Sequence, residues 1–266
     1  EWPPNFWLVG VGGCCIMAAA GLLGRCASLA LILLLSAAPC PAQAPPAFEA
    51  RLELLRNGKE LGESVFTFEA SDGRWRMESR IRGTRGLARF IGLRESSVSE
   101  GDWLDGAARP LQFERSVKAV KTFEWSAEFD WQEGVVRSVY PDGESSLELQ
   151  PGVVEEAGIG LRIRAGLARG EDNWHLLVVD EDEIEEQHFA LREVERIQTS
   201  LGCLEAYRVE KVRDPSSKRY TRTWYAAEHD FVPVRIEHGK KGDDHMESRI
   251  IGITVDGRTV ERGPDC

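Results

Sequence analysis

The sequence predicts a mainly β protein, and three observations support that fold class. Apolar and polar residues alternate with a period of two in short segments after Pro45-Pro46. Turn sequences such as Asn57-Gly58 separate these segments, and alternating segments joined by such turns are typical of β-hairpins. A single later segment, residues 153–168, has apolar residues at helical spacing instead.

The first three strands are predicted to form a meander. Alternation over residues 48–55 ends at the Asn57-Gly58 turn, and the next strand covers residues 65–70. Ser71-Asp72-Gly73 then predicts a second turn, because these residue types favour tight turns. The third strand follows over residues 75–82.

A short helical or irregular element is predicted over residues 84–92, where Leu87, Phe90 and Ile91 are available for burial. Phe123 and Trp125 belong to the longest aromatic strand that follows, and their side chains share one side with Phe129 and Trp131. Such a face must be buried against a core or hold an apolar group. The strands of this region are predicted at residues 94–99, 111–118, 122–131, 135–140 and 145–149.

One α-helix is predicted over residues 153–168, because Val154, Leu161 and Ala165 recur at helical spacing and Gly170 follows as a stop signal. Strands then continue over residues 174–179, 187–192, 196–199, 205–213, 219–225, 232–238 and 246–254. We expect a single β-rich domain over residues 45–256 and a loose tail over residues 257–266.

The first 44 residues are predicted to be a leader. Met17 opens a segment in which Arg25 precedes an apolar run, Leu29–Leu35, and small residues follow it up to Ala44. That order is typical of a secretory signal peptide and predicts a periplasmic protein, with residues 1–16 as a start artefact. An uncleaved anchor built from residues 6–23 is the alternative.

The cleavage point stays open between Ala42 and Ala44. Cleavage after Ala44 would place Pro45 first, whereas cleavage after Ala42 places Cys40 at the third position back. Lipid attachment to Cys40 needs small residues before it, and Pro39 disfavours that modification.

Charge and cysteine content narrow the class of protein further. The formal net charge is −11, so most of the surface repels nucleic acids and anionic lipid headgroups, and we expect membrane contact only through the leader. Two cysteines, Cys203 and Cys266, lie beyond the leader. In an oxidising compartment they either form a disulfide or remain as a buried and a free terminal thiol.

Several short motifs in the second half resemble the exported bacterial family known as domain of unknown function 3108. They are residues 194–202 (VERIQTSLG), residues 206–209 (AYRV) and residues 223–236 (TWYAAEHDFVPVRI), together with the earlier Gly58–Gly62 segment. Where family members often begin the helix with Asp-x-x-Ser, this chain has Glu155-Glu156-Ala157-Gly158. The resemblance implies a curved antiparallel sheet that looks like the open half-barrels of lipoprotein carriers, with one central helix, and it implies no catalytic residues.

The concave face of such a sheet is the first candidate site, because one helix does not always fill it and an apolar ligand could bind there. The alternative is that the aromatic side chains only form the core with the helix. The residues predicted to line this face are Phe66, Phe68, Trp75, Phe113, Phe123, Trp125, Phe129 and Trp131.

Three polar clusters are weaker candidates. The acidic run Asp180–Glu186 could attract Ca²⁺ but is typical of a solvated hairpin tip. His238, Asp243, Asp244 and His245 could hold Zn²⁺ at a turn, although two lysines intervene. Glu228-His229-Asp230 is better interpreted as a polar turn than as an acid–base cluster.

No hydrolase or cofactor motif accompanies these clusters, so the sequence predicts no enzyme, cofactor or metal site. We therefore expect a protein that binds or shields an apolar or lipid-like ligand at the cell envelope. The alternative is an envelope module that contacts a protein partner without any ligand.

Overall fold

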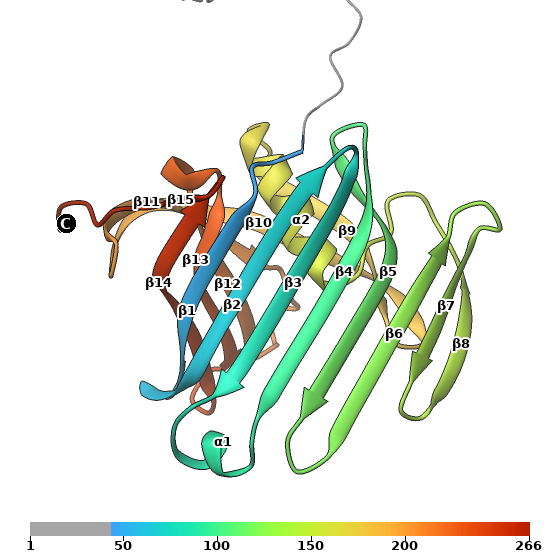
Figure 1. The fold of residues 1–266 in the computed structure, drawn as a ribbon, viewed down its shortest axis with the longest axis horizontal. Coiled ribbons are helices and arrows are strands. Elements are labelled where there is room, and N and C mark those ends of the chain that lie inside the picture. Colours follow the sequence, from blue (N-terminus) through green and yellow to red (C-terminus); the bar gives the residue numbers. More distant parts are fainter. Residues whose placement is uncertain (1–43) are drawn as a thin grey trace, which may run out of the picture. The chain divides into compact units, whose positions relative to one another are not determined.

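The computed structural model describes residues 44–266. The predictions for the signal peptide, the anchor and lipid attachment to Cys40 lie outside the described residues. The chain from Phe48 onward forms one large antiparallel sheet with a helix on its concave side (Figure 1). The predicted mainly β fold with a curved, open antiparallel sheet is therefore confirmed.

The sheet is built from long meanders, whose strands follow one another in space as they do in sequence. The first half contains β1 (Phe48–Arg56), β2 (Lys59–Ser71), β3 (Arg74–Gly83), α1 (Gly86–Phe90), β4 (Arg94–Leu104), β5 (Ala107–Lys118), β6 (Thr122–Asp130), β7 (Val135–Tyr140) and β8 (Gly143–Glu148). The second half contains α2 (Glu156–Ala168), β9 (Asn173–Asp180), β10 (Glu183–Thr199), β11 (Gly202–Lys211), β12 (Arg219–Ala226), the 3₁₀ turn η1 (Ala227–His229), β13 (Val232–Lys240), β14 (His245–Val255) and β15 (Arg258–Thr259).

The two halves join where β1 pairs with β14, so the strand order runs β8-β7-β6-β5-β4-β3-β2-β1-β14-β13-β12-β11-β10-β9. Strands β8 and β9 are the two ends of this sheet, which is not closed by hydrogen bonds between them. Val154 forms a parallel bridge with Val178 and covers part of the β9 edge. In the described part of the chain, β8 has no strand on its outer edge.

Helix α2 is buried on two sides, which is unusual for a helix lying on a sheet. Leu161 and Ala165 belong to a cluster with β1, β2, β13 and β14, whereas Ile163 and Leu167 belong to a second cluster with β9–β12. Gly166 permits this close approach, because a Cβ there would lie 2.2 Å from the Trp174 indole nitrogen. A third cluster joins β5–β7 to β9.

Several boundaries differ from the predictions for identifiable reasons. The helix begins at Glu156 rather than at residue 153, because Val153 and Val154 are extended and Glu155 is the N-cap. The two strands predicted at 187–192 and 196–199 are one strand, β10, in which a bulge near Leu191 shifts the alternation.

The tail is not loose as predicted. Its first residues form β15, which pairs with β14, and the last residues lie against the turn before β11. There the Gly263 N–H donates to the Leu201 carbonyl, and the Cys203 N–H donates to the Pro264 carbonyl. None of the helices between residues 44 and 266 has the length and apolar character required to span a bilayer.

Candidate functional site

The predicted aromatic face lies on the concave side, as expected, but it is occupied by the protein itself. Five of its eight aromatic side chains are buried, namely Phe68, Trp75, Phe113, Trp125 and Phe129. The other three, Phe66, Phe123 and Trp131, are half-buried and pack against the same clusters. The structure therefore places Phe66, Phe68 and Trp75 in the cluster that includes α2, and it packs the other five against β9, rather than around a partly empty hollow.

Hydrogen bonds fix the indole rings of this face. The Trp125 N–H donates to the Ser138 hydroxyl at 2.9 Å, the Trp131 N–H donates to the Pro110 carbonyl at 2.7 Å, and Trp75 donates to the Asp102 carbonyl. Buried indoles normally find such partners, and here all three come from neighbouring strands. The sheet thus orients these rings, and their N–H groups need no ligand as a hydrogen-bond acceptor.

One buried carboxylate lies between α2 and the sheet. The Glu155 side chain accepts hydrogen bonds from the Ser99 hydroxyl at 2.7 Å and from the N–H groups of Ala157 and Gly158. Burial raises the pKa of Glu155 to about 7, although the three donors oppose that shift. Glu155 thus caps the helix, and through Ser99 it fixes α2 against β4.

The three polar clusters that the sequence offered as weaker candidate sites lie in different parts of the fold. Asp180 ends β9 and Glu183 begins β10. The acidic run therefore forms the turn of the β9–β10 hairpin and the strand residues next to it, as predicted. The His245 ring contacts the Tyr220 hydroxyl at 2.5 Å, while His238 lies on β13. Within residues 44–266, no group of three or more His, Cys, Asp or Glu side chains could hold a metal ion.

Glu228, His229 and Asp230 form and end the 3₁₀ turn η1. The three residues line a shallow hollow of about 370 Å³ together with residues 255–260. The Asp230 carbonyl accepts a hydrogen bond from Arg164 of α2, which ties the turn to the helix. This cluster is therefore part of a chain corner, consistent with the interpretation as a polar turn.

A larger hollow lies on the outer face of β5–β8, and sequence reasoning missed it. Its volume is about 640 Å³, and the outward residues that line it alternate with buried ones on the opposite face of the sheet. The outward side chains are polar or acidic apart from the exposed side chain of Val139 and the cation Arg137. The outward side chains are Gln112, Glu114, Ser126, Glu128, Arg137, Val139, Glu144 and Ser146.

The free edge of β8 borders this outer hollow. The Leu149 N–H donates to the Gly134 carbonyl beside β7, so alternation directs the N–H groups of Glu144, Ser146 and Glu148 away from β7. These outward N–H groups are available to a further strand. The only sequence signal was the ordinary alternation of polar residues in β5–β8, which does not distinguish a hollow from a flat surface.

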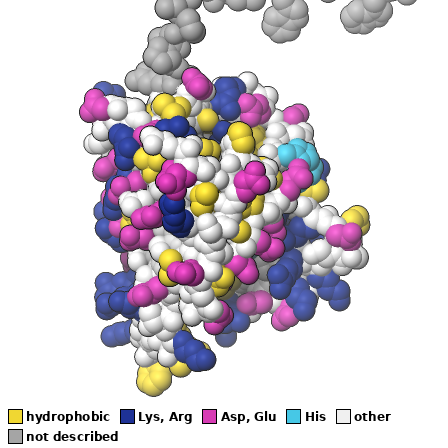
Figure 2. Space-filling view, turned by 90° about the vertical axis from the view of Figure 1, so that its right-hand side faces the viewer, with side chains coloured by type: hydrophobic (Ala, Val, Ile, Leu, Met, Phe, Trp, Pro, Cys, Tyr) yellow, Lys and Arg dark blue, Asp and Glu magenta, His cyan; other side chains and the backbone are white. Residues whose placement is uncertain are grey.

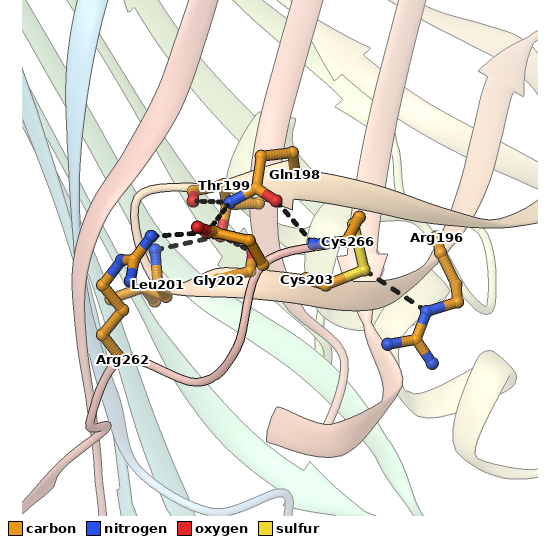
Figure 3. The surroundings of a disulfide bond; sticks show 9 residues. Arg196, Gln198, Thr199, Leu201, Gly202, Cys203, Arg262 and Cys266 are labelled. Atoms are coloured by element: carbon orange, nitrogen blue, oxygen red, sulfur yellow. Dashed lines mark hydrogen bonds and ion pairs between the residues drawn. A yellow bond between two sulfur atoms is a disulfide. The ribbon is translucent and has the colours of Figure 1, made fainter.

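A disulfide joins Cys203 at the start of β11 to Cys266, 63 residues later (Figure 3). Gln198 supports the tail from β10, because its amide donates to the Asp265 carboxylate and its oxygen accepts from the Cys266 N–H. The sequence left open whether these cysteines form a disulfide or remain as thiols, and the structure shows the disulfide.

Comparisons with known proteins agree with this architecture. The model of a family of proteins of unknown function, DUF3108, matches residues 48–242. No curated protein matches the chain. A β-barrel-like protein of domain of unknown function DUF1849 from Brucella abortus is similar at 12% identity and a TM-score of 0.55, over 80% of this chain and 98% of that chain. A candidate lipoprotein from Parabacteroides distasonis aligns at 10% identity and a TM-score of 0.33, over 80% of this chain and 97% of that chain.

Proposed function

The chain belongs to the DUF3108 family of proteins of unknown function, and from its geometry we propose that it is a non-enzymatic, protein-binding module of the cell envelope. The observation that carries this proposal is the filled concave face. Helix α2 and the aromatic residues occupy the space in which a carrier would hold its ligand. The free recognition elements are instead on the outside, at the β8 edge and the outer hollow.

These two elements together suit an extended polypeptide. A peptide strand added to β8 would use the outward N–H groups of Glu144, Ser146 and Glu148, as in β-strand addition. Its side chains would lie nearest Glu144 of β8, and Glu128 on β6 and Glu114 on β5 continue the acidic surface across the outer hollow, while Arg137 is already paired with Asp130 and Glu133. We therefore propose a partner segment with basic side chains.

Carriage of a lipid-like ligand is the competing function. It would require α2 to leave its position between two core clusters, together with Leu161, Ala165, Ile163 and Leu167. Burial of a Leu or Ile side chain stabilises by about 1.5–3 kcal/mol, so this displacement is costly. The filled face thus favours the protein-binding function.

Export to the periplasm is part of the proposal. The Cys203–Cys266 disulfide supports it, because such bonds persist in oxidising compartments and are rare in the cytosol. The signal-peptide pattern around Arg25 and Leu29–Leu35 supports the same location.

The test is purification of the tagged full chain from its native envelope, followed by native mass spectrometry. We expect one stoichiometric protein partner and no bound lipid. Ser146→Pro should weaken that complex, because it removes an outward N–H and leaves the β7–β8 ladder intact. Glu128→Lys with Glu144→Lys should weaken it as well, whereas Glu63→Lys with Glu69→Lys, at exposed positions of β2, is the control with the same net charge.

Two results would overturn the proposal. Bound lipid without a protein partner would favour carriage, and a partner that tolerates both sets of variants would place recognition elsewhere. Thermal unfolding of each variant shows separately whether the fold is retained.

A further inference from the structure

The lower end of the sheet in Figure 1 carries apolar side chains that the protein does not cover. Leu87 and Phe90 in α1 are 70% and 86% exposed, and Val120 in the β5–β6 connection is 82% exposed. The prediction that Leu87 and Phe90 would be buried is therefore wrong. Figure 2 shows hydrophobic side chains at the lowest point of the molecule, with Lys and Arg side chains close by.

Backbone hydrogen bonds hold this exposed segment in place. The Thr84 and Arg85 N–H groups donate to the Leu61 carbonyl, and the Leu93 N–H donates to the Ala88 carbonyl. Ala88 is buried against Gly83, where a Cβ would lie 2.8 Å from the Ala88 backbone. The apolar side chains are thus presented by an ordered turn whose own packing faces the sheet.

The two connections that carry these side chains have a charge opposite to that of the whole chain. We define the basic tip as residues 82–94 and 118–122, which together contain six Lys or Arg residues and no acidic residue, in a chain of net charge −11. Among residues 44–266, Arg85 pairs with Glu60, but no ion pair is formed by the other five, which are Arg82, Arg89, Arg94, Lys118 and Lys121.

Three of these cations lie directly opposite one another on neighbouring strands. Arg82 is the cross-strand partner of Arg94, and Arg94 is the partner of Lys118. Arg82 also faces Glu63 of β2, but neither Arg94 nor Lys118 has an acidic cross-strand partner. Like charges in such positions destabilise a sheet, so the fold alone gives no reason for the Arg94–Lys118 pair. An anionic surface would remove the repulsion.

We propose that the basic tip docks onto the surface of an anionic lipid bilayer, with Leu87, Phe90 and Val120 inserted among the headgroups. Cations and apolar side chains on one surface are the combination that binds such interfaces. A projecting tip also suits a bilayer better than a protein partner, because stable protein interfaces need roughly 1,000 Å² of complementary surface. The proposal departs from the expectation of membrane contact only through the leader, which averaged charge over the whole chain.

The test is vesicle co-sedimentation of residues 44–266, which contain all three core clusters and so fold around their own core. Omitting residues 1–43 removes the apolar leader as a second membrane contact. Vesicles contain either phosphatidylcholine alone or an equal mixture with phosphatidylglycerol. We expect binding to the anionic vesicles only, and loss of binding as NaCl rises from about 0.1 M to about 1 M, since the Debye length falls from about 10 Å to about 3 Å.

Two sets of variants locate the contact. Leu87→Ser with Phe90→Ser should weaken binding at least about tenfold through the lost apolar burial. Arg89→Glu, Lys118→Glu and Lys121→Glu together should weaken it at least about 100-fold, at about fivefold for each of the three cations lost. The control with the same net charge reverses Arg51, Arg76 and Arg258, which are exposed outside the basic tip, and should retain most binding.

Absence of wild-type binding to anionic vesicles would overturn the proposal, as would equal weakening by the control and the tip variants. Binding to poly-L-glutamate but not to vesicles would overturn it in favour of an acidic protein partner. A salt-independent interaction with both kinds of vesicle would show non-specific adsorption and would equally contradict it.

Discussion

The guanidinium of Arg164 stacks on the Phe48 ring at 4.8 Å and joins helix α2 to the first strand of the sheet. Arg164 is only 2% exposed. It donates to the Asp230 carbonyl at 2.7 Å and to the Pro46 carbonyl at 3.0 Å. Burial lowers the pKa of Arg164 to about 10, so the side chain remains charged at neutral pH. One buried cation therefore connects the helix, the first strand and the η1 corner.

We predict that Arg164→Ala lowers the free energy of unfolding by about 3 kcal/mol, because it leaves a cavity and two carbonyls without their donor. Arg164→Met should cost less, since it keeps the volume and removes a buried charge. Urea denaturation monitored by tryptophan fluorescence measures both. Equal losses for the two variants would show that packing volume is not the main contribution.

The buried Glu155 gives stability a pH dependence of defined sign. Its folded pKa of about 7 lies above the ordinary pKa of 4.5 for a glutamate, so the folded state holds a proton that the unfolded state has released between these pH values. Stability therefore falls as pH rises from about 4.5 to about 7, by up to about 3 kcal/mol.

Glu155→Gln should remove this slope, because the amide does not titrate. We predict that the stability difference between the variant and the wild type changes in favour of the variant from pH 5 to pH 8, which urea titrations at several pH values would measure. Other titrating groups cancel in that difference. Parallel stability curves for the two proteins would contradict the assignment.

The strands could be predicted because alternation and turns are local signals. Asn57 and Gly58 have φ values of 50° and 74°, as a two-residue hairpin turn of that sequence requires. The curvature of the sheet came from the family resemblance, because no local pattern specifies which strands meet after a meander. The β1–β14 pairing joins residues about 200 positions apart, and period-two alternation carries no information on such partners.

The state of the concave face could not be predicted, because α2 is apolar on two sides and lacks a clear polar face. The predicted helical stripe contained Leu161 and Ala165, which do pack on the sheet. Ile163 and Leu167 bury a second side, and this additional packing fills the space expected for a ligand. A helix buried nearly all round gives little amphipathic signal, so its sequence does not show how much of the hollow it occupies.

The surface features were missed for a different reason. Leu87 and Phe90 were expected to be available for burial because apolar side chains usually are buried, but no element covers them in the described structure. The absence of acidic residues between Arg82 and Arg94 was visible in the sequence. It indicated a local charge reversal that the net charge of the chain concealed.

Two glycines of α2 offer a matched pair of substitutions. A Cβ at Gly166 would lie 2.2 Å from the Trp174 ring nitrogen, whereas a Cβ at Gly160 would meet nothing within 4 Å. Gly166→Ala should therefore destabilise by about 1–3 kcal/mol through overpacking. Gly160→Ala should stabilise by up to about 1 kcal/mol through helix propensity. Thermal unfolding distinguishes them, and stabilisation by both would show that α2 is less tightly enclosed than the structure indicates.

The Cys203–Cys266 disulfide should stabilise the whole domain, not only the tail. The bridge spans 63 residues, from β11 to the end of the chain, and thus encloses β12, β13 and β14. Closing a loop of that length restricts the unfolded chain and contributes roughly 4 kcal/mol in the chain-entropy treatment. We predict that dithiothreitol lowers the urea midpoint of the wild type to that of Cys203→Ser with Cys266→Ser, a double variant that should not respond to the reductant. If reduction released only the tail, the midpoint would stay unchanged while residues 257–266 became sensitive to protease, and the stabilising role of the bridge would be refuted.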